Sequence, residues 1–455
     1  MDELIVIGGG LAGCEAAYQA AQRGIFVKLF EMRPNQTTGA HNTADLAELV
    51  CSNSLGSTIF EKAGGLLKEE LRRLGSLLLR CAELSAIPAG SALAVDRFHF
   101  SRLVTQIISN HPNIQVIREE ITKIPSTPTI IASGPLTSPG LSEAIQSLTG
   151  NDNLFFFDAI SPIVSGDTIN FQIAFWGNRY SKDNSVDGDY INCPMTQDEY
   201  QTFVSELITA ERIPLQPFEN HIRSGVRAGI GKYFEGCLPV EIIAERGLQS
   251  LAFGPMRPTG LRDPRNGKRP YAVVQLRQDN FSKTLFNIVG FQTNLLYSEQ
   301  KRVFRMIPGL ENAEFLRYGQ IHRNTYVASP LVLNQFLEIK NREALFFAGQ
   351  LTGVEGYVGN IATGLMAGIN AARRIKGQPL IILPETTIIG ALIKYVSSAE
   401  ISIFQPMKAN FGILPSIEET IPSKQLRGKF LADRAINALN EVIQGEKDLC
   451  LSIDL

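Results

Sequence analysis

The sequence lacks any run of about 18 uncharged apolar residues, the length that a membrane-spanning helix requires. A secretory signal is not expected either. The apolar N-terminal run carries Asp2 and Glu3 instead of a basic segment, and glycines soon interrupt it. We therefore expect a cytoplasmic protein that makes no use of a membrane.

Cysteine pairs and cysteine–histidine clusters are missing as well. The six cysteines are scattered, none forms a Cys-x-x-Cys, and the five histidines do not cluster near them. This spacing argues against a zinc site and against a thioredoxin-like redox pair. We expect no bound metal, and each cysteine taken alone is expected to be a reduced, buried, small apolar residue.

An excess of one charge is absent too. The 43 Lys and Arg against 45 Asp and Glu give a formal net charge of −2. Overall charge therefore does not attract nucleic acid, and RNA binding would need a local patch. With 455 residues, of which 44% are hydrophobic, the chain can bury a sizeable core, and we expect two domains.

What the sequence does contain is a nucleotide-binding pattern at its N-terminus. The apolar residues 4–7 are typical of a buried parallel strand and lead into GGGLAG, a helical stretch at 14–22 and a second strand at 26–30. The three motif glycines allow a tight turn, close approach to a pyrophosphate, and close helix–strand packing. The helix N-terminus offers N–H groups to phosphates. The expected cofactor contacts are Gly8, Gly9, Gly10, Leu11, Ala12 and Gly13.

Glu31 ends the second strand, 18 positions after Gly13, where a carboxylate can accept a hydrogen bond from a ribose hydroxyl. The motif with this acid predicts a bound dinucleotide. It leaves open whether that dinucleotide is FAD or NAD.

Two later segments favour FAD. Residues 129–135 indicate a buried strand ending in small residues that include Gly134, and residues 344–349 indicate another strand ending at Gly349. Glu355, Gly356 and Tyr357 follow, and then a helix of small residues at 362–374. A second helix N-terminus aimed at the cofactor suits a flavin ring that carries partial negative charge. Ordinary packing of strands and helices is the alternative.

These patterns predict an α/β fold: a doubly wound, Rossmann-like FAD-binding domain with an inserted mixed α+β domain. We expect residues 1–154 and 326–455 to form the two parts of the FAD-binding domain. Residues 155–325 would form the inserted domain on the substrate side, with strands at 271–276 and 285–291 and a helix at 197–210.

Two cysteines stand out by their surroundings. Cys51 follows a stretch expected to be helical and lies among polar residues in ELVCSNSL, and Cys237 lies between residues that fix the backbone in FEGCLPV. A thiolate with a lowered pKa is a strong nucleophile. From the residues alone, a structural thiol remains the alternative for each.

A basic stretch at residues 256–277 holds six Lys or Arg against one acid, Asp263. Interleaved proline, glycine and tyrosine suit an ordered loop that grips phosphates, and a solvated surface is the alternative. The RNA-binding candidates within it are Arg257, Arg265, Lys268 and Arg269.

Several segments resemble one family, in the same order along the chain. They are GGGLAG, LFEMRP, LVCSNSL, IPAGSALAVDR, ASGPLTS, FEGCLPVE, FGPMRPTGL, VGFQTNL, MIPGLENAEFLRYGQIHRNTY and GQLTGVEGY. The family is that of the folate- and FAD-dependent tRNA (uracil-5-)-methyltransferases of the TrmFO type, related to the GidA flavoproteins. The resemblance runs from the first residues to about residue 415. The strings VCSNSL and FEGCLPVE occur in few other flavoproteins.

The resemblance implies formation of 5-methyluridine in the T loop of tRNA. In the family, 5,10-methylenetetrahydrofolate donates the one-carbon unit, and reduced FAD, recharged by NADPH or NADH, supplies the electrons. By the family's pattern, Cys237 matches the nucleophile that adds to uracil C6, and Cys51 the second catalytic thiol, as base or flavin-side partner. Tyr357 is expected to stack on the folate pterin. The implied partners are tRNA and folate, and no obligate protein partner is inferred.

Two segments depart from the family's pattern. Residues 221–232 (HIRSGVRAGIGK) look like an insertion, which we interpret as a surface loop in preference to a lid or an RNA contact. Residues 358–361 (VGNI) stand where many members carry Glu-Ser. Because of this difference, we do not expect the side chains at positions 359 and 360 to make the family's contacts. The backbone at these positions could still make contacts.

Three alternative functions stay open. The related GidA-type flavoprotein modifies a wobble uridine with folate and FAD, but it normally carries a long helical C-terminal domain, for which this chain is expected to be too short. The same methylation could act on ribosomal RNA, and the sequence does not distinguish this substrate from tRNA. A flavin oxidoreductase without an RNA substrate would need neither Cys237 nor the basic stretch.

Overall fold

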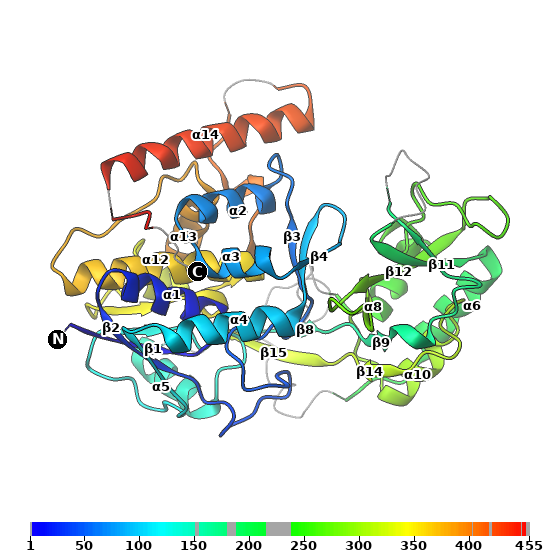
Figure 1. The fold of residues 1–455 in the computed structure, drawn as a ribbon, viewed down its shortest axis with the longest axis horizontal. Helices are drawn as coiled ribbons and strands as arrows, with labels where there is room; N and C mark the ends of the chain where they lie inside the picture. Colours follow the sequence, from blue (N-terminus) through cyan, green and yellow to red (C-terminus); the bar gives the residue numbers. More distant parts are fainter. Residues whose placement is uncertain are drawn as a thin grey trace.

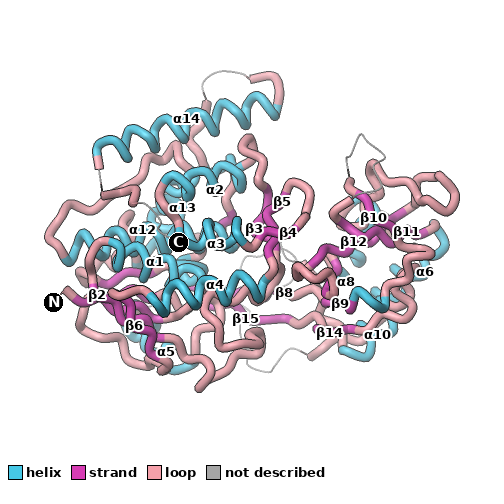
Figure 2. Tube along the Cα trace, viewed as in Figure 1, coloured by secondary structure: helices cyan, strands magenta, loops and turns pink. Residues whose placement is uncertain are grey.

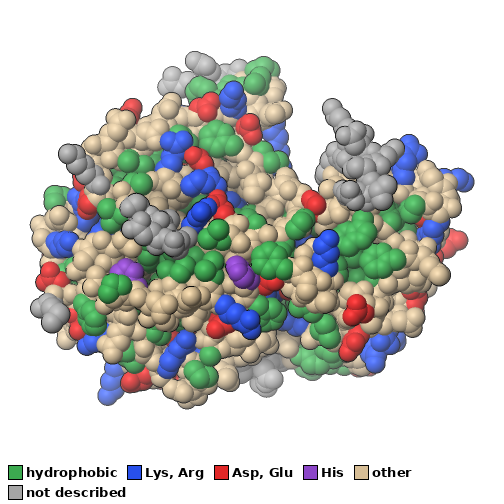
Figure 3. Space-filling view, in the orientation of Figure 1, with side chains coloured by type: hydrophobic (Ala, Val, Ile, Leu, Met, Phe, Trp, Pro, Cys, Tyr) green, Lys and Arg blue, Asp and Glu red, His purple; other side chains and the backbone are tan. Residues whose placement is uncertain are grey.

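The computed structural model describes residues 2–150, 154–179, 188–214, 238–402, 404–417, 421–446 and 448–451. Within them the chain forms two lobes of unequal size (Figure 1). Both ends of the chain build the larger lobe, and its middle builds the smaller one. A notch separates the lobes along one edge of the molecule (Figure 3). Among the described helices, none combines the length and apolar character that a bilayer crossing needs.

A parallel sheet forms the centre of the larger lobe. Its strand order is β16-β7-β1-β2-β6, and every neighbouring pair runs parallel. The chain starts in the middle at β1, moves outward to β2 on one side, and returns much later to β7 and β16 on the other. This confirms the predicted doubly wound α/β fold, in which ligands bind at the carboxyl ends of the strands. The strands are β1 (Glu3–Ile7), β2 (Phe26–Phe30), β6 (Ile114–Ile117), β7 (Thr129–Ile131) and β16 (Leu345–Phe347).

Helices α1 (Leu11–Gln22) and α12 (Tyr357–Ile375) pack closely against each other beside this sheet (Figure 2). Two glycines of α12 permit this approach. A Cβ atom on Gly364 would lie 2.3 Å from the Ala12 carbonyl oxygen, and one on Gly368 would lie 2.5 Å from that of Ala16. The other helices here are α2 (Ala63–Arg73), α3 (Leu77–Leu84), α4 (Arg97–Asn110), α5 (Pro139–Thr149), α11 (Ser329–Val332), α13 (Ile388–Ser398) and α14 (Lys424–Gly445).

The smaller lobe has a separate sheet and a separate core. The sheet has the order β10-β11-β12-β13-β9-β14 with antiparallel neighbours, and buried aromatic residues such as Phe203, Phe286 and Phe304 pack against it. Its strands are β9 (Ile163–Ser165), β10 (Phe175–Gly177), β11 (Tyr190–Met195), β12 (Ala272–Gln278), β13 (Leu285–Ile288) and β14 (Phe315–Arg317). Its helices are α6 (Gln197–Thr209), α8 (Val240–Glu245), α9 (Ser250–Phe253) and α10 (Tyr297–Phe304).

Two strands carry the chain between the lobes. β8 (Leu154–Ala159) and β15 (Ile321–Tyr326) form one antiparallel ladder (Figure 1). The predicted boundaries at 154/155 and 325/326 fall on these strands. Smaller sheets of the larger lobe pair β3 (Ser54–Ser57) and β4 (Ala86–Ile87) with β5 (Ala92–Val95), and β17 (Val354–Glu355) with β18 (Met407–Lys408).

Most predicted elements are confirmed with shifted ends. The helix predicted at 362–374 begins at Tyr357, because Gly356, with φ +88°, turns the chain into it. The strand predicted at 129–135 ends at Ile131. The helical stretch expected before Cys51 is wrong. Residues 48–50 form neither helix nor strand, since the Glu48 carboxylate is engaged by backbone N–H groups of the preceding loop.

Packing of α1 against α12 gives a first prediction. Gly368→Ala is expected to lower the free energy of unfolding by about 1–3 kcal/mol, because its Cβ would meet backbone at Ala16 that no side-chain rotation can move. Gly445→Ala in α14 is the control, since a Cβ there meets no atom within 4 Å. Urea unfolding of both variants measures the difference, and equal midpoints would contradict the close approach.

Candidate active site

The three motif glycines occupy three different environments. Gly8 has φ +105°, and a Cβ on it would lie 2.6 Å from the Ala132 carbonyl oxygen. A Cβ on Gly13 would lie 1.8 Å from the Gly8 carbonyl oxygen, whereas one on Gly10 would meet nothing within 4 Å. Gly8 therefore makes the turn, Gly13 brings α1 onto it, and Gly10 leaves open space at the N-terminus of α1.

Glu31 closes the turn from the end of β2. Its Oε2 accepts the Gly9 N–H at 2.9 Å, and its Oε1 accepts the Arg33 backbone N–H at 3.0 Å and Nε at 2.8 Å. Burial acts to raise the pKa of Glu31, but the hydrogen bonds and charge of Arg33 outweigh it and hold this pKa below its ordinary value. A buried carboxylate thus stands beside the glycine turn, where a ribose would lie.

A groove of about 960 Å³ starts at this turn, and we call it the glycine-turn groove. It extends from Glu31 and Arg33, past Gly10 and Gly134, to the first turn of α12. The predicted cofactor residues that line it are Gly8, Gly10, Leu11, Ala12, Glu31, Gly134, Gly349 and Tyr357. Gly9 and Gly13 belong to the turn but do not line the groove. Glu355 and Gly356 line a neighbouring cavity instead.

The groove has the features that a flavin dinucleotide needs. The N-termini of α1 and α12 supply positive dipole ends along it, one near Gly10 and one near Asn360. The Oδ1 atom of Asn360 is buried without a hydrogen-bond partner. The side chain at position 360, questioned from sequence, therefore does line the groove.

Cys51 and Tyr357 meet where the groove joins a second cavity. This Cys51 cavity, of about 920 Å³, shares six lining residues with the groove: Val50, Pro135, Leu136, Gln350, Tyr357 and Asn360. The Tyr357 hydroxyl accepts the Cys51 backbone N–H at 2.8 Å. Cys51 and Tyr357 are therefore in contact at the junction of the groove and this cavity. The other lining residues include Ser52, Ser54, Ile160, Gln292, Asn324, Glu355, Gly356 and Lys408.

The other described cysteines have different surroundings. Cys14, Cys81 and Cys193 are buried, and burial raises the pKa of each thiol, in the case of Cys81 to about 12. Cys450 is exposed. Cys51 alone among these described cysteines is half-buried and lines one of the two cavities.

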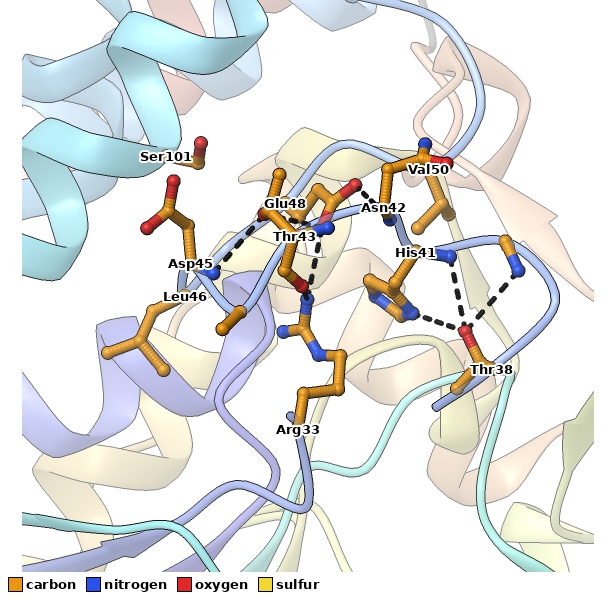
Figure 4. Close-up of polar contacts among 12 residues, drawn as sticks. Arg33, Thr38, His41, Asn42, Thr43, Asp45, Leu46, Glu48, Val50 and Ser101 are labelled. Atoms are coloured by element: carbon orange, nitrogen blue, oxygen red, sulfur yellow. Dashed lines mark hydrogen bonds and ion pairs between the residues drawn. The ribbon is translucent and has the colours of Figure 1, made fainter. Parts of the chain in front are cut away.

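The loop before Cys51 is folded by one carboxylate. Glu48 accepts hydrogen bonds from the backbone N–H groups of Asn42 and Thr43, from the Thr43 hydroxyl and from the Arg33 guanidinium, at 2.8–3.1 Å (Figure 4). Arg33 thereby links Glu31 at the glycine turn to this loop. The sequence analysis did not identify Arg33 or Glu48 as site residues, although Arg33 lies in the LFEMRP segment.

Three arginines hold the segment around Cys51. Arg97 Nη1 donates to the Leu49 carbonyl oxygen at 3.1 Å, and Arg317 Nη2 to that of Val50 at 2.8 Å. Arg277 donates to Ser52 Oγ at 3.0 Å and Asn53 Oδ1 at 2.8 Å. The donors come from α4, β14 and β12, so both lobes fix the segment.

Arg277 corrects one sequence interpretation. It was counted in the basic stretch expected to grip phosphates, but it lies within β12, in which all seven residues are buried, and it is itself 7% exposed. Its guanidinium supports the Cys51 segment from below instead of facing solvent. The apolar run AVV at 272–274 begins this strand, but the polar residues Gln275, Arg277 and Gln278 that follow it show no alternation that would have marked Arg277 as buried.

The four RNA-binding candidates lie on the smaller lobe and are exposed. Arg265 pairs with the buried Asp263 carboxylate at 2.6 Å, and the Arg257 guanidinium donates to the Phe253 carbonyl oxygen. Lys268 and Arg269 lie in the turn of the same loop. None of these four cations lines the groove or the Cys51 cavity.

Cys237 and the segment at 221–232 lie outside the described residues. The described chain resumes at Leu238, and the Val240 N–H donates to the Gln292 carbonyl oxygen at 2.7 Å. Gln292 lines the Cys51 cavity. Within the described residues, no group of three or more His, Cys, Asp or Glu could hold a metal ion.

The contrast between two glycines gives a second prediction. Gly10→Ala is expected to leave apoprotein stability nearly unchanged, because its Cβ meets no protein atom, but to weaken FAD binding by roughly tenfold or more by entering the groove. Gly13→Ala is expected to lower the melting temperature of the apoprotein itself. Calorimetry and FAD titration separate the two effects, and equal FAD affinity of Gly10→Ala and wild type would contradict this assignment.

Known proteins resemble this chain over nearly its whole length. Residues 3–379 match the family described as glucose inhibited division protein A. The methylenetetrahydrofolate–tRNA-(uracil-5-)-methyltransferase TrmFO of Natranaerobius thermophilus is 54% identical over 97% of this chain and 99% of its own. The TrmFO of Anoxybacillus flavithermus is 52% identical with the same coverage.

Solved structures agree on the fold. A crystal structure of Aquifex aeolicus GidA superposes with a TM-score of 0.67 at 18% identity, covering 99% of this chain and 74% of that chain. A second crystal form of the same protein gives a TM-score of 0.64. At this identity the likeness concerns the fold, and the sequence relatives give the finer grouping. The chain therefore belongs to the glucose inhibited division protein A family, and within it to the TrmFO group.

Proposed function

We propose that this protein is a methyltransferase that forms 5-methyluridine in the T loop of tRNA, with 5,10-methylenetetrahydrofolate as one-carbon donor and FAD as cofactor. The TrmFO relatives, at more than 50% identity, are named methylenetetrahydrofolate–tRNA-(uracil-5-)-methyltransferases, which supports the folate donor and a tRNA uracil as substrate. The observation that carries the proposal is the contact of Cys51 with Tyr357 at the junction of the groove and the Cys51 cavity.

The groove fits FAD along its length. The adenosine end would lie at Glu31, the pyrophosphate at Gly10 and the N-terminus of α1, and the flavin ring near Tyr357 and Asn360. When bound and recharged by NADPH or NADH, FAD would supply the two electrons that convert a methylene carbon to a methyl group. The flavin end then borders the Cys51 cavity, where folate and uridine would have to meet.

The folate co-substrate is proposed to occupy the Cys51 cavity. The Tyr357 ring lines it, and an aromatic face suits offset stacking with a pterin. The Tyr357 hydroxyl is fixed by the Cys51 N–H, so the ring is held in one orientation. Lys408 lines the same cavity and is our candidate for a carboxylate of the glutamate tail.

Uracil needs a nucleophile and a base to react at C5. We propose that the Cys237 thiolate adds to C6, so that the electrons of the C5–C6 double bond become available at C5. After the carbon is transferred, a base takes the C5 proton, the C5–H electrons restore the double bond, and the Cys237 thiolate leaves. Cys51 is our candidate for that base.

The cysteine assignments give a third prediction. With 5-fluorouridine in the RNA, no C5 proton can be removed, so the wild-type protein is expected to accumulate a covalent complex visible by denaturing electrophoresis. Cys237→Ala is expected to form none and to lose at least about a thousandfold in methylation rate. Cys51→Ala should still bind RNA.

Cys193→Ala is the matched control, because that thiol is buried in the core of the smaller lobe. Near-normal methylation by Cys237→Ala would remove the nucleophile assignment. A complex formed equally well with fluorinated ribosomal RNA would move the proposal to that substrate.

The basic loop gives a fourth prediction. Reversing Arg265, Lys268 and Arg269 together is expected to weaken tRNA binding and to reduce the slope of log affinity against log salt by about two to three, because fewer counterions are released. Reversal of the exposed Lys424, Arg427 and Lys429 on α14 is the matched control. An unchanged slope for the first variant would exclude the loop from the RNA interface.

A further inference from the structure

The charges around Cys51 do not balance among the described residues. Arg97 forms a bidentate ion pair with Asp279, at 2.7 Å for both hydrogen bonds. Arg277 and Arg317 are largely buried and form no ion pair with any described carboxylate, at a cut-off of 4.0 Å. Two guanidinium groups thus stand behind the Cys51 segment without a partner of opposite charge.

The charged residues around the Cys51 cavity also include more cations than carboxylates among the described residues. Glu48 on the Cys51 loop is already paired with Arg33. The remaining charged side chains that face the segment come from α4, β12, β14, β17, β18 and the turn after β12. The cations are Arg97, Arg277, Arg317 and Lys408, and the carboxylates are Asp279 and Glu355.

Buried cations without a counter-ion are costly, because desolvation is not repaid by attraction. The hydrogen bonds of Arg277 and Arg317 go to neutral acceptors: carbonyl, hydroxyl and amide oxygens. These satisfy the N–H groups but bring no negative charge. A nearby group that can become negative is therefore stabilised in its ionised form.

Cys51 is the group in the right place. Arg317 donates to the residue before it and Arg277 to the residue after it, so the two guanidinium groups hold the chain on both sides of Cys51. The Tyr357 hydroxyl, another titratable group at this place, already accepts the Cys51 N–H. We propose that Cys51 rests as a thiolate and is the counter-ion of Arg277 and Arg317, which act as positioning residues for its charge.

The arginines respond to the same charge. Burial lowers the pKa of Arg277 and of Arg317. Negative charge on Tyr190, Asp279 and Cys51 acts in the opposite direction on the pKa of Arg277, and negative charge on Tyr357, Cys51 and Asp279 does so for Arg317. Arg97 also senses Cys51, after the larger contribution of Asp279. Coulombic interaction is mutual, so cations that a thiolate stabilises also stabilise the thiolate.

A resting thiolate deepens the role given to Cys51 under the proposed function. Only the thiolate can accept a proton, and an ordinary thiol with a pKa of about 8.5 is mostly protonated at neutral pH. The charge state itself does not depend on that function. It can therefore be measured in the FAD-loaded protein without RNA or folate.

The test is the pH dependence of Cys51 alkylation by iodoacetamide, followed for each cysteine by peptide mass spectrometry. For wild type, the rate is expected to stay nearly constant from about pH 9 down to about pH 7, instead of falling about tenfold per unit below ~8.5. Arg277→Gln and Arg317→Gln are each expected to shift the midpoint of this profile upward by about one pH unit, so that alkylation is roughly tenfold slower at pH values below the wild-type midpoint.

Three comparisons separate charge from structure. Arg317→Lys keeps the charge and is expected to keep most of the wild-type rate at neutral pH. Arg302→Gln removes an exposed cation of the smaller lobe and should change nothing. The exposed Cys450, read in the same spectra, should react at the same rate in every variant.

An ordinary thiol profile in wild type would overturn the proposal, and so would Gln variants whose profile matches wild type. In that case the excess positive charge would serve an anionic ligand of the cavity instead. If the Gln variants fail to fold, the alkylation profiles of the wild type and of Arg317→Lys still show whether Cys51 rests as a thiolate. None of these outcomes bears on whether the protein methylates tRNA, which the fluorouridine trap tests separately.

Discussion

The arrangement of the site depends on the buried ion pair between Arg97 and Asp279. Arg97 begins α4 in the larger lobe, and Asp279 directly follows β12 in the smaller lobe. The same guanidinium donates to the Leu49 carbonyl, so one residue joins the lobes and anchors the Cys51 segment. Removing one partner of such a pair typically costs about 3–5 kcal/mol, because the other charge stays buried and unpaired. Asn53 and Asp96 add hydrogen bonds across the same junction.

Around this junction, two sites share a wall. The glycine-turn groove is built from local features: a strand, a tight turn and a helix N-terminus within the first 31 residues. The Cys51 cavity is built from residues of both lobes, including Gln292 and Lys408. Tyr357 belongs to both and fixes the Cys51 backbone. A cofactor in the groove and a co-substrate in the cavity would therefore meet at one side chain.

This division explains what could be predicted from the sequence. The parallel sheet followed from contiguous patterns, and the structure confirms it. The glycine turn before α1 followed from the same pattern, and the cofactor roles of Gly8, Gly10 and Gly13 remain predictions. The contacts of Arg277 and Arg317 with the Cys51 segment did not follow, because they depend on strand pairing in a lobe more than 200 residues away along the chain. Arg277 was counted with a surface stretch, since no alternation marks a strand buried on both faces. The roles of Cys237 and the basic loop remain predictions.

The most direct test of the account is mass analysis of T-loop nucleosides. Unmethylated tRNA would be incubated with the protein, NADPH and methylenetetrahydrofolate labelled with deuterium at the transferred carbon, and separately with S-adenosylmethionine. The account predicts 5-methyluridine in the T loop that retains two deuterium atoms in its methyl group, and none with S-adenosylmethionine. Methylation that requires S-adenosylmethionine, or an unlabelled methyl group, would contradict it.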